Sequence, residues 1–151
     1  MALTGKLSIE VGIQASAAKF FKLFATELHD VQNHADTVHE TMVHQGDWHS
    51  IGSVKQWTYT LDGKVVSCKE KVESIDEEKK TITYSLFDGD VAQKYKTFKL
   101  IFQVIDKNDG RAAVNWTIEY ERINEDIQPP FSYIEYFYKS TTSIDGNLPK
   151  A

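Results

Sequence analysis

The sequence predicts an α+β fold, in which a curved antiparallel sheet of seven strands wraps around one long C-terminal helix. Apolar and polar residues alternate in seven segments, turn residues separate most of them, and two prolines precede a final amphipathic segment. Because the apolar face of a sheet and the apolar side of a helix each need a partner, a sheet that bends around the helix is the compact solution.

The N-terminal part predicts one strand followed by two short helices. Alternation in LSIEVGI indicates a strand over 3–13. Ser16 can cap the helix that follows, AAKFFKLFATELHD, in which the phenylalanines recur at helical spacing. A second short helix is expected over 33–37.

Turn residues divide the middle of the chain into six further strands. The steps DG at 62–63, DGD at 88–90 and NDG at 108–110 are typical of hairpin turns, so they favour an antiparallel meander. The strands are expected over 38–45, 52–61, 64–74, 80–87, 94–105 and 111–122.

The last segment predicts a long closing helix, because the Pro129-Pro130 pair can occupy its first turn. Its bulky aromatic residues come early, whereas the small polar residues Ser140 and Thr141 lie in its middle. We therefore expect the helix to leave part of the concave side of the sheet unfilled. The residues on its apolar side are Tyr133, Phe137, Ile144 and Leu148.

Composition and charge narrow the class of protein. The 151 residues contain no repeat or linker, so we expect a single domain over 1–151. The net charge of −5 argues against nucleic acid as a partner, because its binding relies on clustered lysine and arginine. No apolar run is long enough to cross a bilayer, and no leader-like segment stands at the N-terminus. We expect a cytoplasmic protein without stable membrane insertion, either a monomer or a weak dimer.

The five histidines lie in one stretch, HDVQNHADTVHETMVHQGDWH, at a constant spacing of five residues. Five residues turn a helical side chain by about 140° and move a strand side chain to the opposite face, so this spacing does not gather metal ligands. No cysteine or carboxylate set completes a zinc site, and no Ser–His–Asp arrangement is indicated. We expect no metal, no cofactor and no catalytic residues.

In the strand VVSCKEKVES, Cys68 and Glu70 lie on the same face as two valines. A carboxylate on an apolar face must pair, bind water or rise in pKa. Two alternatives stay open: Glu70 is a polar anchor at the floor of a cavity, or it turns outward at a bulge or pairs with lysines at the surface. Cys68 is interpreted as a small apolar wall residue, because no neighbouring group is expected to activate its thiol.

The other candidate ligand-binding residues come from the apolar faces of later strands and of the last helix. Most of them would be buried in any packed core, but the tyrosine hydroxyls would need partners there. On the strands they are Tyr84, Leu86, Tyr95, Phe98, Leu100 and Trp116; on the helix they are Tyr133, Phe137, Thr141 and Ile144.

Five segments of the chain are similar to one known family: MALTGKL, HQGDWHSIGSVKQWTYTLDGK, KEKVESIDEEKKTITYSLFDGD, NWTIEYE and PPFSYIEY. They resemble major latex protein-like members of the birch-pollen-allergen superfamily, which includes pathogenesis-related proteins of class ten and START-like proteins. The resemblance implies a helix-grip fold with a hydrophobic cavity, and Glu70 aligns with a ligand-contacting glutamate of hormone-receptor relatives. The receptor gate Ser-Gly-Leu-Pro-Ala is replaced by LDGKVVSC, so hormone reception is not expected.

These observations favour a protein that binds and carries or stores small hydrophobic molecules, of lipid, steroid, hormone or secondary-metabolite type. The resemblance adds a role in plant defence or stress response. The alternative is a non-hydrolytic enzyme of secondary metabolism, an isomerase or condensing catalyst that uses Glu70 as acid or base. A third hypothesis is a module that docks a protein partner after ligand entry.

Overall fold

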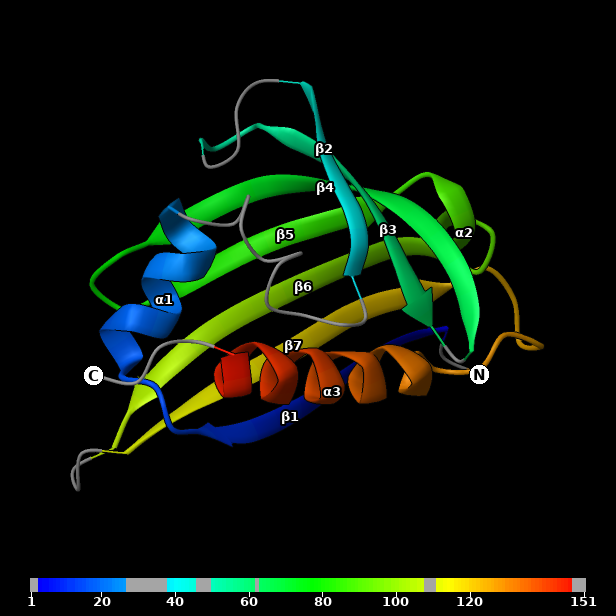
Figure 1. Cartoon of the computed structure of the whole chain (residues 1–151). Helices are drawn as coiled ribbons and strands as arrows, with labels where there is room; N and C mark the ends of the chain where they lie inside the picture. Colours follow the sequence, from blue (N-terminus) through cyan, green and yellow to red (C-terminus); the bar gives the residue numbers. More distant parts are fainter. Residues whose placement is uncertain (1–2, 27–37, 46–49, 62, 108–110, 148–151) are drawn as a thin grey trace.

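The structure, a computed structural model, describes residues 3–26, 38–45, 50–61, 63–107 and 111–147. Over these residues an antiparallel sheet curves around the long helix α3 (Phe131–Asn147), while α1 (Ala17–Thr26) lies at one end of the sheet (Figure 1). The α+β class and the antiparallel sheet with its C-terminal helix are therefore confirmed. The predicted helix over 33–37, the end of the first predicted helix and Leu148 lie outside the described residues.

The sheet of the described residues has seven strands in the order β1-β7-β6-β5-β4-β3-β2. Strands β2 to β7 form a meander, and β1 returns to pair with β7. Each observed strand begins and ends within two residues of its predicted bounds, because side-chain alternation is a local property of the sequence. The strands are β1 (Thr4–Ile13), β2 (Val38–Gln45), β3 (Val54–Leu61), β4 (Lys64–Asp76), β5 (Thr81–Phe87), β6 (Tyr95–Asp106) and β7 (Ala112–Arg122).

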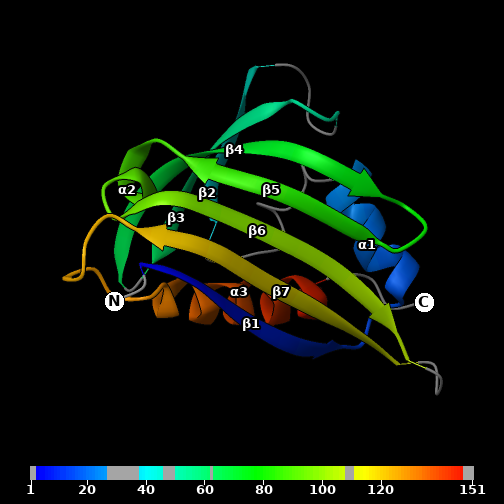
Figure 2. The same cartoon turned by 180° about the vertical axis from the view of Figure 1, so that it is seen from behind.

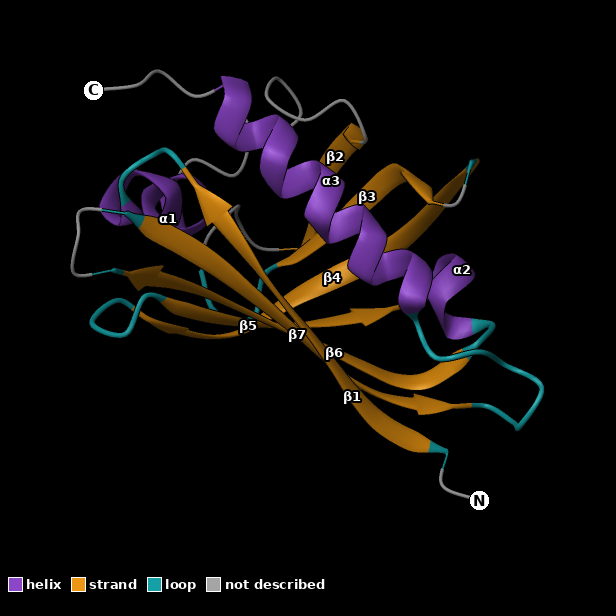
Figure 3. Cartoon of the chain, turned by 90° about the horizontal axis from the view of Figure 1, so that it is seen from below, coloured by secondary structure: helices purple, strands orange, loops and turns teal. Residues whose placement is uncertain are grey.

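The two faces of the sheet have different surroundings. Seen from behind, the convex face carries no helix along most of its surface (Figure 2), whereas the view from below shows α3 running across the concave side (Figure 3). The burial of side chains alternates in agreement with this division: in β7, Trp116 and Ile118 are buried, whereas Thr117 and Glu119, which each follow one of them, are only partly buried.

One short helix was not predicted. The sequence indicates only a turn at 88–90, but α2 (Gly89–Ala92) follows directly after Asp88. Asp88 and Gly89 have φ values of 56° and 65°, which reverse the chain. The Asp90 carboxylate then accepts a hydrogen bond of 2.9 Å from the Ser67 backbone N–H. This contact with β4 lies far away in sequence, so local turn chemistry could not indicate it.

Helix α3 is hydrogen-bonded near its C-terminus to the connection between β1 and α1, and near its N-terminus to the sheet. Near its C-terminus, the Asp145 carboxylate accepts hydrogen bonds from the backbone N–H groups of Gln14 and Ala15, at 2.8 and 2.9 Å. Near its N-terminus, the hydroxyls of Tyr133 and Tyr59 are hydrogen-bonded at 2.8 Å. These contacts attach both ends of α3 to the rest of the fold, on either side of the residues that face the cavity.

Candidate functional site

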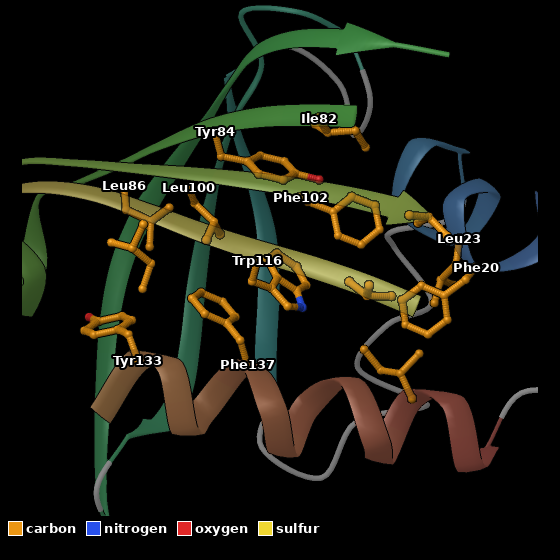
Figure 4. Close-up of a cluster of buried hydrophobic side chains, with 14 of the residues drawn as sticks. Phe20, Leu23, Ile82, Tyr84, Leu86, Leu100, Phe102, Trp116, Tyr133 and Phe137 are labelled. Atoms are coloured by element: carbon orange, nitrogen blue, oxygen red, sulfur yellow. The ribbon is translucent and has the colours of Figure 1, made fainter. Parts of the chain in front are cut away.

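A cavity lies between the concave face of the sheet and α3. The cavity has a volume of about 70 Å³, and the empty space among its lining residues and at its opening is about 650 Å³. Figure 4 shows Tyr133 and Phe137 rising from α3 toward Leu86, Leu100 and Trp116 of the sheet. The lining residues are Phe24, Trp57, Tyr59, Cys68, Glu70, Tyr84, Leu86, Leu100, Trp116, Tyr133, Tyr136, Phe137, Ser140, Thr141 and Ile144.

Most of the residues that the sequence singled out lie in this wall. The structure brings together Cys68, Glu70, Tyr84, Leu86, Leu100, Trp116, Tyr133, Phe137, Thr141 and Ile144. Whether they bind a ligand stays a prediction.

Tyr95 and Phe98 do not line the cavity, contrary to expectation. Both are buried, but a shift in the pairing of β6 with β7 lies between Tyr95 and Thr97. The Tyr95 hydroxyl donates to the Gln128 carbonyl at 2.8 Å, and the Phe98 ring packs on Tyr133 at 4.8 Å between centroids. Their side chains therefore pack between the sheet and the residues at the start of α3.

Five lining residues were missed by the sequence analysis: Phe24, Trp57, Tyr59, Tyr136 and Ser140. For β3 the signal was present, because the large residues of KQWTY alternate with polar ones. The strand was recognised, but no face was assigned to it. Ser140 was noted only as a small residue in the middle of the helix.

One wall of the cavity is built from stacked aromatic rings. The rings of Trp116 and Phe137 stack at 4.7 Å with an angle of 13° between their planes. Phe24 from α1 packs on Phe102 at 4.4 Å and meets Trp116 edge-on at 5.7 Å. The indole N–H of Trp116 donates to the Thr141 hydroxyl at 2.8 Å, so this wall presents no unpaired indole to the cavity.

The opposite wall contains polar atoms without partners. Trp57 Nε1, Glu70 Oε1 and the Tyr84 hydroxyl are buried, line the cavity and make no hydrogen bond. They come from the adjacent strands β3, β4 and β5. Because buried polar groups in folded proteins are nearly always paired, three such atoms in one cavity indicate a place for water or a ligand.

Glu70 points inward, and the alternative of an outward side chain is excluded. Its side chain is 8% exposed, and the bulge in β4 lies between Val72 and Ser74 instead. Burial raises the pKa of the Glu70 carboxyl, while the charge of Lys55, its cross-strand partner in β3, opposes this effect. The Trp57 indole also favours the charged form, although its N–H does not meet the geometry of a hydrogen bond.

Other buried groups of the site are held in their neutral forms. Burial and the nearby Glu70 raise the pKa of Tyr84 well above its ordinary value. Burial raises the pKa of the Cys68 thiol to about 12, although a hydrogen bond with Tyr59 lowers it in part. Cys68 is 3% exposed, which fits a wall residue and not a reactive thiol.

Metal binding and membrane insertion find no support in the part of the chain that the structure describes. No group of three histidine, cysteine, aspartate or glutamate residues is placed there to hold a metal ion. The histidine side chains lie outside the described ones, so the expectation about them is not tested. No described helix has both the length and the apolar character that a membrane span requires.

Comparisons with known proteins give one consistent result. A family model described as "Pathogenesis-related protein Bet v 1 family" matches residues 2–151. MLP-like protein 43 of Arabidopsis thaliana is 36% identical over 148 residues, which is 97% of this chain and 94% of that protein. Major latex protein 146 of Papaver somniferum is 35% identical over 149 residues, covering 97% and 92%.

Solved structures agree with the sequence matches. The crystal structure of major latex-like protein 151 from Panax ginseng has a TM-score of 0.92 and 33% identity, and the match covers 98% of this chain and 100% of that one. The structure of Ara h 8.0201 has a TM-score of 0.74 at 18% identity over 95% of this chain and 96% of that one, which shows similarity of fold alone.

Proposed function

Because the chain belongs to the pathogenesis-related Bet v 1 family as a major latex protein-like member, we propose that it binds a small hydrophobic molecule in the cavity under α3 and carries or stores it. The observation that carries this proposal is the cavity itself, whose wall is mostly aromatic and aliphatic and includes a few polar atoms. This combination is typical of small-molecule binding sites.

The mechanism is removal of the ligand's apolar surface from water. Burial contributes about 25 cal/mol per Å², so about 200 Å² of apolar ligand surface would provide about 5 kcal/mol. Aromatic walls such as Trp116 and Phe137 can stack on flat ligands, and the unpaired polar atoms of the opposite wall can set their orientation.

The biological setting of the proposal is defence or stress response in plants. Its support is the family description together with relatives from Arabidopsis, Papaver and Panax. The ligand classes considered are lipids, steroids, hormones and secondary metabolites.

The test is a titration with a fluorescent apolar probe, 1-anilinonaphthalene-8-sulfonate, followed by displacement with lipids and steroids. We expect saturable binding of one probe per chain. Ser140→Leu would fill the cavity from the middle of α3 and should weaken binding at least tenfold. Thr142→Leu, on the exposed side of the same helix, is the matched control and should bind as the parent does. Failure of a diverse apolar library to bind the parent protein would refute the proposal.

A second candidate function is favoured by Glu70 and Tyr84, which face the same cavity with pKa values raised by burial. A carboxyl group of raised pKa keeps its proton to a higher pH than an ordinary carboxyl, so it can act as an acid as well as a base, as isomerases and condensing enzymes require. Glu70→Gln separates the two functions, because it should change binding modestly but abolish turnover. Any substrate that the parent protein converts and the variant does not would establish the enzyme.

A further inference from the structure

Three buried polar atoms of the cavity lack partners, and their chemistry restricts what the ligand can be. Burial of an unpaired polar atom is unfavourable, so such atoms persist in a folded protein where water or a ligand completes them. The fourth such atom among the described residues is Asn115 Oδ1, which does not line the cavity. The unpaired atoms are thus concentrated in one wall.

The pairing of the strands places the three side chains next to one another. In the β3–β4 ladder Trp57 lies opposite Cys68 and Lys55 opposite Glu70, so Trp57 is the diagonal neighbour of Glu70. In the β4–β5 ladder Glu70 lies opposite Leu86 and Val72 opposite Tyr84, so Tyr84 is its diagonal neighbour on the other side. Diagonal neighbours of this kind are within reach of long side chains. One small group of a ligand can therefore approach all three.

We propose that the ligand presents an uncharged hydroxyl group, an alcohol or a phenol on an apolar body, to Trp57 Nε1, Glu70 Oε1 and the Tyr84 hydroxyl. This inference rests on the proposed binding function and adds the chemical class of the ligand. The Trp57 indole only donates, so the ligand must accept there. Glu70 and Tyr84 can each accept, and Tyr84 can also donate, so a ligand group that both accepts and donates can pair with all three atoms. A hydroxyl does both with one oxygen.

Other polar groups satisfy this wall less well. A ligand carboxylate has no hydrogen to donate and would stand beside the Glu70 carboxyl. An ammonium cannot accept from the Trp57 N–H. A ketone oxygen only accepts, through two lone pairs, so it pairs with at most two of the three atoms, whereas a hydroxyl has one hydrogen and two lone pairs for all three. A hydrocarbon leaves all three atoms unpaired, and a site built of buried polar groups discriminates strongly against a ligand that lacks their partner.

The facing wall indicates the shape of the apolar body. Trp116 and Phe137 lie nearly parallel, 13° apart, and Phe24 meets the Trp116 ring edge-on. The rings stack on one another and form a rigid apolar surface, so a rigid ring system, fused aromatic or polycyclic, suits this wall.

The test compares ligands that share one body and differ in one group: 2-naphthol, naphthalene, 2-naphthoate, 2-acetylnaphthalene and 2-(aminomethyl)naphthalene. Dissociation constants are measured by equilibrium dialysis for the parent protein, for the double variant Trp57→Phe/Tyr84→Phe, and for Tyr138→Phe as an exposed control. Thermal unfolding verifies that each variant is folded. For each protein we take the ratio of the dissociation constant of naphthalene to that of 2-naphthol. The two ligands differ in hydrophobicity by the same amount in every experiment, so a change in this ratio between proteins reports on the hydroxyl contact alone.

We expect this ratio to fall at least tenfold in the double variant and to stay unchanged in Tyr138→Phe. Within the parent protein, 2-naphthoate and the cationic amine should each bind at least tenfold more weakly than 2-naphthol, a comparison that stands even where the double variant does not fold. If all members bind and the ratio is the same in every protein, the hydroxyl inference is overturned, while the binding function survives. Equal affinity of the ketone and the naphthol, with equal sensitivity to the variants, also overturns it. If no member of the series binds, the binding function itself fails.

Discussion

The indole N–H of Trp116 on β7 donates a 2.8 Å hydrogen bond to the hydroxyl of Thr141 on α3. Both side chains are buried, at 4% and 0% exposure, and the indole ring stacks on Phe137 one helical turn earlier. This pair joins the helix to the sheet inside the wall of the cavity. It differs from Trp57, a half-buried residue of the same cavity whose buried indole N–H has no acceptor.

Replacement of Thr141 by valine tests this link. The variant keeps the shape of the side chain but removes the acceptor, so the buried Trp116 N–H is left unpaired. We expect the free energy of unfolding to fall by about 1–3 kcal/mol in urea denaturation. Thr142→Val, whose hydroxyl bonds only to carbonyls of its own helix, is the control and should change it by less than about 0.5 kcal/mol. Equal effects of the two variants would show that the bond to Trp116 does not stabilise the fold.

The second prediction concerns the C-terminal end of α3. Asp145 accepts hydrogen bonds from the backbone N–H groups of Gln14 and Ala15, so Asp145→Ala should remove these two hydrogen bonds. We expect a loss of about 1–3 kcal/mol in the free energy of unfolding, because hydrogen bonds to a charged group are among the stronger ones. Hydrogen exchange at the Gln14 and Ala15 amides should accelerate.

A surface ion pair on the same helix provides the control for Asp145. Glu135 and Lys139 pair at 2.7 Å, but both side chains are more than 60% exposed. Glu135→Ala should therefore cost no more than about 0.5 kcal/mol. If Asp145→Ala lowered the free energy of unfolding no more than Glu135→Ala, the hydrogen bonds of Asp145 to the β1–α1 connection would not stabilise α3.

The third prediction concerns the turn that leads into α2. Gly89 has a φ of 65°, and a Cβ at this position would collide with the Ser67 carbonyl oxygen of β4. Gly89→Ala should therefore cost more than the conformational penalty alone, which is about 1 kcal/mol. Gly63 is the matched control, because its φ of 76° is similar and no atom lies within 4 Å of the added Cβ. The difference in melting temperature between the two alanine variants measures the effect of the collision. Equal melting temperatures would mean that β4 moves to accommodate the Cβ without loss of stability.

The fold could be predicted from the sequence because its signals are local. Alternation in each strand and the prolines before α3 need no knowledge of distant residues, so the predicted strand bounds agree closely with the observed ones. Helix α2 depends instead on the hydrogen bond between Asp90 and Ser67, two residues that are far apart in the sequence. Local turn chemistry carries no sign of that contact.

The candidate site could be predicted where it depends only on the alternation of side chains between the two faces of a strand, which we call strand parity. Parity placed Cys68, Glu70 and Tyr84 on the concave face, where the structure has them. Tyr95 was singled out for its hydroxyl and not by its place in the alternation, and the register shift beside it and the Gln128 carbonyl decide where that hydroxyl lies. Alternation also could not show that the Trp57 indole is unpaired, because that depends on how three neighbouring strands pack.

The remaining prediction follows from the buried Glu70 carboxyl, whose pKa is raised above its ordinary value of 4.5. A carboxyl with a higher pKa in the folded than in the unfolded chain binds more protons in the folded state between the two values. The contribution of Glu70 to the free energy of unfolding is therefore greatest below about pH 4.5. It falls as the pH rises from there through the pKa of the folded state. Lys55, Trp57 and Tyr84 are the groups beside Glu70, and the opposing effect of Lys55 is smaller than that of burial.

Glu70→Gln removes this titration while it keeps the size and polarity of the side chain. We expect the variant to be more stable than the parent at pH 8 and the difference in melting temperature to shrink toward zero as the pH is lowered below about 4.5. Glu77→Gln, exposed in the turn between β4 and β5, should follow the parent at every pH. The measurement is thermal unfolding from pH 4 to pH 9. A Glu70→Gln variant that is less stable than the parent at pH 8 would show that the ionised carboxylate is favoured in the folded protein, because Lys55 then outweighs burial.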